Sequence, residues 1–381
     1  MSNDYLFNEM KTVVSPSLIY YRDIIQRNIQ LAVTTAGGSQ YLWPHVKSHK
    51  MADVIRLSID SGIRRFKCAT IAEAETAASC GARHVLLSYP LVGPNITRFL
   101  QLQHAYPYTC FYAAADNIEL LRQLAQVSLN MPEPSDIKIL IDINMGMNRT
   151  GVLPDEAIHF CKQCKEIEGI SLAGIHCYDG NCTDSDVPAR RRNITNINHT
   201  LKKLLQDILS SCPNCNMMVI GGTPSFPYHA LEWKNFSLPS EFQVFFSPGT
   251  VFIYDAGYQK KYPDLPYTPG AGILTRVISH PAESFFTLDC GYKAIAADPI
   301  GSRGILLGVS NCEEAFQSEE HWTFRMKSGH ESERPAIGQE LIIIPTHICP
   351  TSALYSHAIV IEKGTIVAKW PVTARSRKIL Y

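Results

Sequence analysis

Lys47 has the residue type and the setting of a lysine that reacts through its amine. It lies in residues 43–50 (WPHVKSHK), where a short strand-like run ends in a basic cluster and a helical pattern follows at once. A lysine placed where a buried strand meets a loop can lose its proton through desolvation, and an uncharged amine attacks carbonyl compounds. Lys47 is therefore a candidate Schiff-base lysine. A solvated basic loop is the alternative that this segment alone leaves open.

Two further loops offer side chains for contacts with a flat, anionic ring. Residues 142–152 (DINMGMNRTGV) follow a strong strand pattern and carry Arg149 among glycines that permit tight turns. A guanidinium there could hydrogen-bond a phenolate or a carboxylate, although an ordinary surface arginine fits the same pattern. Tyr178 ends the strand pattern of residues 174–180 (GIHCYDG) and could stack on the ring, with a packed core aromatic as the alternative.

Glycine and hydroxyl residues follow two later strand patterns. The segments IGGTPS and SPGT contain Gly222, Thr223, Gly249 and Thr250. Such residues expose backbone N–H groups and short donors, which hold a phosphate without a dedicated cation. Barrels often bind a phosphate at the loops after strands seven and eight, which are the two strands in question.

His347 and Cys349 form a candidate metal-binding pair near the end of the sequence. They lie two residues apart in residues 342–350 (IIIPTHICP). In extended backbone both side chains point the same way, so an imidazole nitrogen and a thiolate could share one metal ion. A core cysteine beside a hydrogen-bonded histidine is the alternative.

Two Cys-x-x-Cys pairs raise the question of a structural zinc site. Cys161/Cys164 and Cys212/Cys215 could together supply four thiolates. However, the first pair lies on a helical pattern, where positions i and i+3 share one apolar face. The twelve cysteines are scattered along the chain, and we interpret most of them as small buried hydrophobic residues of a reducing compartment.

The elements that must position these side chains alternate between strand and helix from residue 22 to about 255. A (β/α)8 barrel fits this pattern, with a doubly wound open sheet as the alternative. Parallel barrels place their chemistry at the C-terminal ends of the strands, and Lys47 follows the first strand. Asp116 with Glu119 is predicted to begin one of the helices. The eight predicted strands are residues 41–46, 65–68, 84–89, 109–113, 137–143, 171–176, 216–220 and 243–247.

The pattern changes after residue 265 to strands and turns without long helices, which predicts a second, mostly antiparallel β domain. The proline-rich residues 262–270 form the boundary. The predicted domains are therefore a barrel over 15–262 and a β domain over 270–381, with residues 1–14 packed on the β domain. The predicted strands of this domain are residues 271–279, 284–289, 304–308, 321–326, 340–344, 357–362 and 365–370.

Composition excludes several classes of protein. Lys plus Arg equals Asp plus Glu, 35 each, so no general nucleic-acid binding is expected. No apolar stretch approaches the roughly 20 residues of a membrane helix, and residues 1–14 lack a secretory signal pattern. We expect a cytoplasmic protein without a membrane partner.

Several of these segments, in this order, resemble one family. PHVKSHK with CATIAEAE (residues 44–50 and 68–75), then SEEH, PTHICP and WPVTAR toward the end, are similar to the D-threonine aldolase and D-serine dehydratase family of pyridoxal phosphate enzymes. The resemblance runs essentially end to end. It implies the alanine-racemase-like fold (fold type III of pyridoxal phosphate enzymes), a (β/α)8 TIM barrel followed by a mostly antiparallel β domain.

The resemblance also implies roles for residues. Lys47 would be the Schiff-base lysine, Arg149 would contact the phenolic oxygen of pyridoxal 5'-phosphate, and Tyr178 would stack on its ring. His347 and Cys349 would bind a divalent metal, Zn or Mn, which the racemases lack. The expected phosphate contacts are Gly222, Thr223, Gly249 and Thr250.

Two departures weigh against a racemase. Ser247 stands where a racemase has the arginine for the ring nitrogen, and the opposite-face tyrosine of the racemases is missing. The expected activity is D-threonine aldolase, a retro-aldol cleavage of a β-hydroxy-D-amino acid to glycine and an aldehyde. D-Serine dehydratase, which gives pyruvate and ammonia, is the first alternative, and an amino-acid racemase is the second.

Other points stay open at the level of the sequence. A non-catalytic protein that handles pyridoxal phosphate is disfavoured because about 110 residues follow the linker. The base of the retro-aldol route is not identified, and His45, His176 and His321 are candidates only. The family usually forms dimers, so the resemblance implies a homodimer with a small D-amino acid as its substrate.

Overall fold

The structure, a computed structural model, describes residues 3–377. They divide into two compact units. The β unit contains residues 3–31, 48–53 and 250–375, and the barrel unit contains residues 32–47, 54–249 and 376–377. Three segments that were expected in the barrel lie in the β unit, namely residues 15–31, 48–53 and 250–262. The domain boundaries of 15–262 and 270–381 stay a prediction.

The barrel unit is built on a parallel sheet whose seven strands follow one another in sequence order. Each strand pairs with the next in parallel register, as βαβ units require. The strands are β2 (Arg65–Cys68), β3 (His84–Leu87), β4 (Cys110–Ala115), β5 (Ile137–Asn144), β6 (Ile170–Tyr178), β7 (Met217–Ile220) and β8 (Gln243–Phe246).

A short extended segment takes the eighth position, between β8 and β2. The Trp43 amide donates to the Phe246 carbonyl over 2.8 Å, and the Lys67 amide donates to the Pro44 carbonyl over 2.8 Å. Parallel bridges join Leu42 to Phe246 and His45 to Lys67. The predicted strand 41–46 therefore makes only single bridges, because Pro44 has no N–H to donate and a 3-10 turn follows at Val46–Ser48. The predicted fold class is confirmed.

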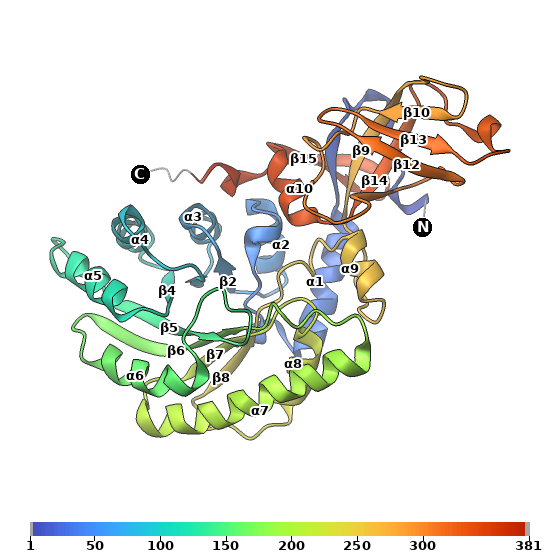
Figure 1. Cartoon of the computed structure of the whole chain (residues 1–381). Helices are drawn as coiled ribbons and strands as arrows, with labels where there is room; N and C mark the ends of the chain where they lie inside the picture. Colours follow the sequence, from blue (N-terminus) through green and yellow to red (C-terminus); the bar gives the residue numbers. More distant parts are fainter. Residues whose placement is uncertain (1–2, 378–381) are drawn as a thin grey trace. The chain divides into compact units, whose positions relative to one another are not determined.

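Helices cover the outer side of this sheet (Figure 1). Their apolar faces and the buried strands form the core, and a second cluster that includes Trp43, Tyr112, Leu140 and Phe245 is buried among the strands. The helices that precede or alternate with these strands are α1 (Arg22–Ala36), α2 (Ala52–Asp60), α3 (Ile71–Ser79), α4 (Pro94–Ala105), α5 (Ile118–Leu129), α6 (Ala157–Lys165), α7 (Val187–Ser211) and α8 (Phe226–Lys234). Most of α1 belongs to the β unit.

The β unit contains a mostly antiparallel sheet in the order β12-β13-β10-β9-β1-β15-β16, with β14 pairing β9 and β11. The strand β1 (Ser17–Tyr21) lies between β9 and β15 and is parallel to β15. Two short helices, α9 (Ala256–Lys261) and α10 (Ile348–Leu354), belong to this unit. The other strands are β9 (Ala271–Ser279), β10 (Phe285–Leu288), β11 (Gly304–Leu306), β12 (Cys312–Gln317), β13 (Trp322–Met326), β14 (Glu340–Pro345), β15 (His357–Glu362) and β16 (Thr365–Pro371).

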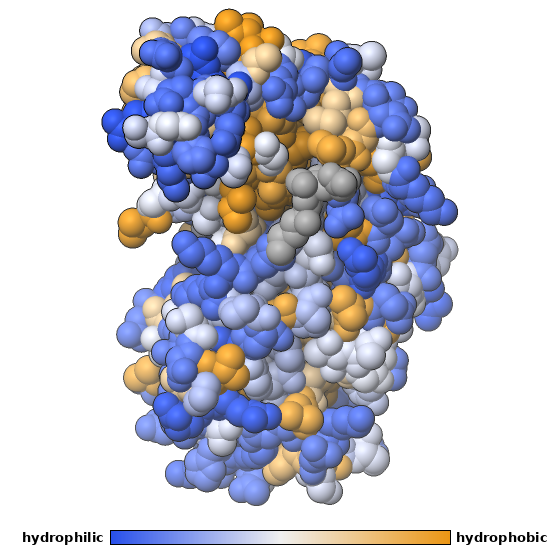
Figure 2. Space-filling view, turned by 90° about the vertical axis from the view of Figure 1, so that its right-hand side faces the viewer, coloured by the Kyte–Doolittle hydropathy of each residue, from blue (hydrophilic) through white to orange (hydrophobic). Residues whose placement is uncertain are grey.

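Apolar side chains from the beginning of the chain contribute to the core of the β unit. Tyr5, Phe7, Met10 and Val13 are buried in one cluster with side chains of β1, β9, β14 and β15. Figure 2 shows one face of the molecule, on which hydrophobic residues gather in the upper part of the view. None of the helices in residues 3–377 has the length and apolar character needed to cross a membrane.

Candidate active site

Three of the predicted site residues line one cavity at the C-terminal ends of the barrel strands. Lys47 lies in the 3-10 turn after the closing segment, Arg149 in the loop after β5, and Tyr178 at the last position of β6. All three line a cavity of about 550 Å³ within the barrel unit. This volume falls in the range of small-molecule sites. The parallel arrangement of the strands thus brings together residues that are far apart in sequence.

Three basic side chains lie close to the ring of Tyr178. The Nζ of Lys47 lies 5.8 Å from the ring centroid, the Nζ of Lys67 lies 5.4 Å from it, and the Cζ of Arg149 lies 5.2 Å from it. The negative face of an aromatic ring attracts cations at these distances. The cavity therefore places basic side chains beside a flat aromatic wall, which suits an anionic, planar ligand.

The sequence did not single out Lys67. Its side chain is buried and lines the same cavity, and its Nζ lies 3.4 Å from Nε2 of His176. Burial lowers the pKa of Lys67 to about 7, and the charge of Lys47 contributes to this lowering. A lysine inside the strand pattern RFKC was the available signal, because a charge at a buried strand position is rare unless it has a function or a partner.

His176 links Lys67 to a carboxylate. Nδ1 of His176 lies 2.7 Å from Oδ1 of Asp142, and both side chains are buried. Burial and the charge of Lys67 lower the pKa of His176. Burial alone would raise the pKa of Asp142, but its hydrogen bonds with His176 and Thr150 hold it below the ordinary value. The carboxylate is therefore ionised and accepts the Nδ1–H of a neutral imidazole.

The loop that carries Arg149 is fixed by hydrogen bonds at both ends. Oδ1 of Asn144 accepts the amides of Gly146 and Asn148, at 3.0 and 3.1 Å. The Gly151 amide donates to the Asp116 carboxylate over 2.8 Å. Gly151 has φ +101°, and a Cβ there would lie 2.6 Å from the Asn144 nitrogen, so only glycine fits.

In the predicted phosphate loops, some backbone N–H groups donate hydrogen bonds to side chains of the loops themselves. The Gly222 amide donates to Oγ of Ser225 over 3.0 Å, and the Gly249 amide donates to Oγ1 of Thr223 over 3.3 Å. The Gly222 backbone approaches the Tyr178 ring so closely that an added Cβ would lie 3.0 Å from its Cε2. The first loop thus forms part of the wall beside the aromatic ring.

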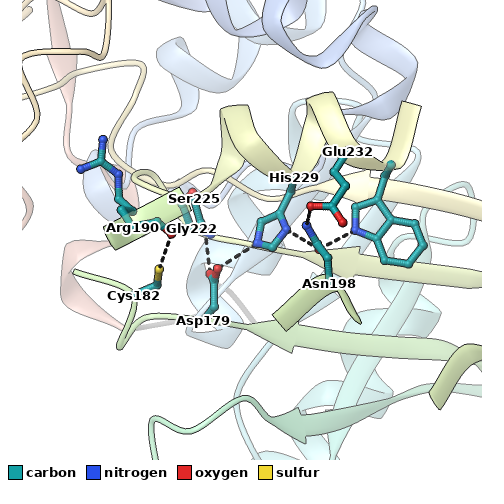
Figure 3. Close-up of polar contacts among 9 residues, drawn as sticks. Asp179, Cys182, Arg190, Asn198, Gly222, Ser225, His229 and Glu232 are labelled. Carbon is teal, nitrogen blue, oxygen red and sulfur yellow. Dashed lines mark hydrogen bonds and ion pairs between the residues drawn. The ribbon is translucent and has the colours of Figure 1, made fainter. Parts of the chain in front are cut away.

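A buried polar network supports this first loop from below (Figure 3). Ser225 donates to Oδ1 of Asp179 over 2.8 Å, and Oδ2 of Asp179 lies 2.8 Å from Nε2 of His229. Nδ1 of His229 lies 2.8 Å from Oδ1 of Asn198. Burial would raise the pKa of Asp179, but the charge and hydrogen bond of His229 hold it below its ordinary value.

The donors and acceptors of this network determine how many protons the His229 ring carries. The Trp233 indole, which can only donate, lies 2.7 Å from Oδ1 of Asn198, and Nδ2 of Asn198 donates to Glu232. Oδ1 is therefore an acceptor, and Nδ1 of His229 must donate to it. Because Nε2 donates to the ionised Asp179, both ring nitrogens carry protons and His229 is an imidazolium.

The candidate metal pair lies in the β unit, where the backbone differs from the prediction. The extended conformation expected across 347–349 is wrong, because His347 is the N-cap of α10 and Cys349 lies in its first turn. The two side chains are nevertheless in contact, and a hydrogen bond with Cys349 raises the pKa of His347 to about 9 despite burial. Nδ1 of His347 lies 2.5 Å from Asp298, which leaves Nε2 for a metal.

Other contacts in the β unit concern the same turn. The Ile348 amide donates to Asp255, and Oγ1 of Thr250 lies 3.6 Å from Sγ of Cys349. Within residues 3–377, no group of three or more His, Cys, Asp or Glu side chains is arranged to hold a metal ion. The metal site at His347 and Cys349 therefore stays a prediction from the sequence.

The remaining candidates have structural partners. His45 lines the cavity, and its Nδ1 accepts the Lys47 amide over 3.2 Å. His321 is exposed in the β unit, between β12 and β13. Ser247 donates to the Trp43 carbonyl over 2.7 Å. The four thiols of the Cys-x-x-Cys pairs are buried, and burial raises the pKa of three of them, which fits small apolar residues better than thiolates.

A parallel barrel with a cavity at the C-terminal ends of its strands, and a separate antiparallel sheet, place this chain in the class of alanine-racemase-like proteins. The family model "Alanine racemase, N-terminal domain" matches residues 21–232, more than half of the chain. The chain belongs to this family. A second family model, "Putative serine dehydratase domain", matches residues 271–361. The resemblance stated from the sequence is confirmed.

Individual proteins support the same placement. A D-threonine aldolase of Arthrobacter sp is 25% identical over 342 residues, covering 88% of this chain and 85% of the relative. A 3-hydroxy-D-aspartate aldolase of Paracoccus denitrificans is 23% identical, covering 96% and 93%. The crystal structure of D-threonine aldolase from Filomicrobium marinum superposes with a TM-score of 0.85 at 24% identity, covering 97% of both chains, which shows the shared fold.

Proposed function

We propose that this chain is a pyridoxal phosphate- and metal-dependent lyase of β-hydroxy-D-amino acids, with D-threonine aldolase activity. The observation that carries the proposal is the position of Lys47, which lines one cavity with Arg149 and Tyr178 at the strand ends of the barrel. An amine, a guanidinium and an aromatic wall match the aldehyde, the phenolic oxygen and the ring of the cofactor.

The residues present fit this cofactor in three respects. The cavity of about 550 Å³ has room for a substituted pyridine ring. The Lys47 amine and the Arg149 guanidinium, both within 6 Å of the Tyr178 centroid, suit the negative charge of a phenolate and a phosphate. The bare backbone of Gly222 beside Tyr178 leaves space that a side chain would fill.

The chain's residues would divide the work as follows. Lys47 would hold the cofactor covalently and Arg149 would hydrogen-bond its phenolic oxygen, while Gly222, Thr223 and Gly249 would contact the phosphate. Thr250 stays a prediction from the sequence as a fourth phosphate contact. When bound, the cofactor supplies an electron sink for negative charge at Cα of an amino acid. Tyr178 would stack on the ring and shield one of its faces.

His347 and Cys349 would hold the divalent metal, Zn or Mn. Asp298 accepts the Nδ1–H of His347 and so presents Nε2, which is the usual arrangement behind a histidine ligand. A thiolate ligand favours Zn over Mn. When bound, the metal supplies a Lewis acid that lowers the pKa of a coordinated hydroxyl.

D-Serine dehydratase is the second candidate function. The match of residues 271–361 to a serine dehydratase domain model favours it, and this segment includes both predicted metal ligands. The same residues serve either reaction, because a polarised β-hydroxyl can lose its proton or leave as hydroxide. A homodimer and a cytoplasmic location stay predictions from the sequence.

Product analysis tests the proposal. The purified protein is incubated with D-threonine or D-serine, with added Zn or Mn and then with a chelator. Glycine with acetaldehyde indicates the aldolase, a keto acid with ammonia indicates the dehydratase, and the L-enantiomer alone indicates a racemase. Borohydride reduction and peptide mapping should place the cofactor on Lys47 in the native protein and remove it in Lys47→Ala. An unchanged tag in Lys47→Ala would contradict the assignment.

A further inference from the structure

Lys67 is a second amine in the cavity that holds Lys47. Its side chain is 3% exposed, and its nitrogen lies within 6 Å of the same Tyr178 ring as the nitrogen of Lys47. Nothing in the proposed roles of Lys47, Arg149 and Tyr178 uses this second amine. A buried lysine without a function is costly, because a charged amine loses its hydration there.

The contacts of Lys67 define its hydrogen-bonding state. Asp142 accepts the Nδ1–H of His176, so Nε2 of His176 has a free electron pair and accepts an N–H from Lys67 over 3.4 Å. An uncharged amine has two N–H groups and one electron pair. When one N–H goes to His176, the electron pair remains to accept a proton in the cavity.

The surrounding charges favour this uncharged form. Lys47 and Arg149 repel a charge on Lys67, and burial disfavours that charge most strongly, whereas Asp142 and Asp179 attract it. The balance lowers the pKa of Lys67 to about 7. The titratable or charged side chains that approach Lys67 from neighbouring elements are Lys47, Asp142, Arg149, His176, Tyr178 and Asp179, with His45 on the adjoining segment.

We infer that Lys67 is a further catalytic residue, which accepts the β-hydroxyl proton of the bound amino acid while His176 and Asp142 position its amine. The inference rests on the proposed aldolase function and supplies the base that the retro-aldol route lacks. The Lys67 electron pair forms an N–H bond with the hydroxyl proton. The O–H pair becomes the second bond of the product aldehyde, and the Cα–Cβ pair stays on Cα. The resulting ammonium returns the proton to Cα, so Lys67 ends the turnover unchanged.

The first test measures the amine itself, in the protein as purified and without turnover. Trace labelling with acetic anhydride between pH 5 and 10, followed by peptide mass spectrometry, gives the reactivity of each lysine. Lys67 should reach half-maximal reactivity near neutral pH, about three pH units below the ordinary value of 10.5 for a lysine amine. A midpoint at that ordinary value, or no labelling of Lys67 at any pH, would overturn the inference.

The second test separates a base from a fixed positive charge. Lys67→Met removes the amine, and Lys67→Arg keeps a charge that is not lost at these pH values. Both should lower kcat at least 100-fold while borohydride still places the cofactor on Lys47. Lys138→Met, on β5 and outside the cavity lining, is the matched control and should keep native turnover. Native kcat in Lys67→Arg would show that only the charge matters and would refute the base.

The positioning residues give a third readout. His176→Leu removes the acceptor of Lys67 and should move the acidic limb of the kcat/KM profile by a pH unit or more, whereas a merely structural role would leave the limb in place. If Lys67→Met does not fold, Lys67→Arg and His176→Leu carry the test. If the native protein neither traps the cofactor nor cleaves any D-amino acid, the proposed function fails, while the labelling still reports the state of Lys67.

Discussion

His229 donates through Nε2 to the Asp179 carboxylate over 2.8 Å, at a place where neither side chain reaches solvent. The other ring nitrogen is committed to Asn198, so the pair consists of a full imidazolium and a full carboxylate. Asp179 also accepts from Ser225, whose oxygen in turn accepts the Gly222 amide. The buried ion pair is thus linked through Ser225 to the loop that is predicted to hold the phosphate.

Removal of one partner from this pair should destabilise the barrel unit strongly. Asp179→Ala leaves a buried imidazolium without a counter-charge, which costs about 3–5 kcal/mol. Urea unfolding at neutral pH measures the loss. Nitrogen-15 spectra of the native protein should show both His229 nitrogens protonated. A single protonated nitrogen would contradict the assignment.

The same pair should make the free energy of unfolding depend on pH in the acidic range. The folded-state pKa of Asp179 is held below its ordinary value, so its contribution is complete above the unfolded pKa of about 4 and is lost as pH falls through the folded value. The free energy of unfolding should therefore fall more steeply below pH 4 in the native protein than in Asp179→Asn. Equal slopes for the two proteins would exclude this contribution.

Lys67 should make the free energy of unfolding rise with pH in the neutral to alkaline range. Its pKa is about 7 in the folded protein, whereas the ordinary value for a lysine amine is 10.5. Between these values the unfolded chain binds more protons, so the free energy of unfolding increases with pH, by on the order of 5 kcal/mol in total. Lys67→Met lacks this dependence, and its stability relative to the native protein should be greatest at pH 6 and should decline toward pH 10.

The turn at Gly151 should tolerate no side chain. Gly151→Ala adds a Cβ 2.6 Å from the Asn144 nitrogen at a positive φ, and the loop that carries Arg149 must shift. We expect at least tenfold weaker binding of pyridoxal phosphate, measured by absorbance titration, together with a lower Tm. Gly169→Ala is the control, because it also has a positive φ but nothing within 4 Å of its Cβ. Equal losses in the two variants would assign the effect to φ alone.

The carboxylate behind His347 should control metal affinity. Asp298 accepts the Nδ1–H of His347, and loss of such a partner typically weakens metal binding 10–100-fold. Asp298→Asn should therefore lose Zn at a lower chelator concentration than the native protein, and His347→Ala should not retain it. His330→Ala changes a histidine of the same unit outside this site and should bind Zn normally. Unchanged metal content in His347→Ala would exclude the predicted site.

The sequence predicted well what depends on local patterns. Strand periodicity located all seven ladder strands of the barrel, and the residues at their ends indicated Lys47, Arg149 and Tyr178. It missed what depends on the closing of the barrel. A lysine within the strand pattern RFKC hinted at Lys67, but only the tertiary structure brings it to His176, which contacts Asp142.

Two local predictions failed for stated reasons. Asp116 was expected to begin a helix, but Asn117 caps α5 and Asp116 instead accepts the Gly151 amide from another loop. The expected extended backbone at His347 and Cys349 is the first turn of α10, which spacing alone does not reveal. In the first case a tertiary contact determined the partner of the polar residue, and in the second the start of a short helix determined the backbone.

The placement of β1 has a consequence for how the chain acquires its structure. This strand lies near the beginning of the sequence, yet its two neighbours, β9 and β15, begin about 250 and 340 residues later. During synthesis one edge of β1 stays without its native partner until β9 has been made, and the other edge until β15 has been made. Its apolar residues Leu18 to Tyr21 are then an exposed strand edge, so we expect ribosome-bound chains that end before β15 to be those that recruit chaperones or aggregate.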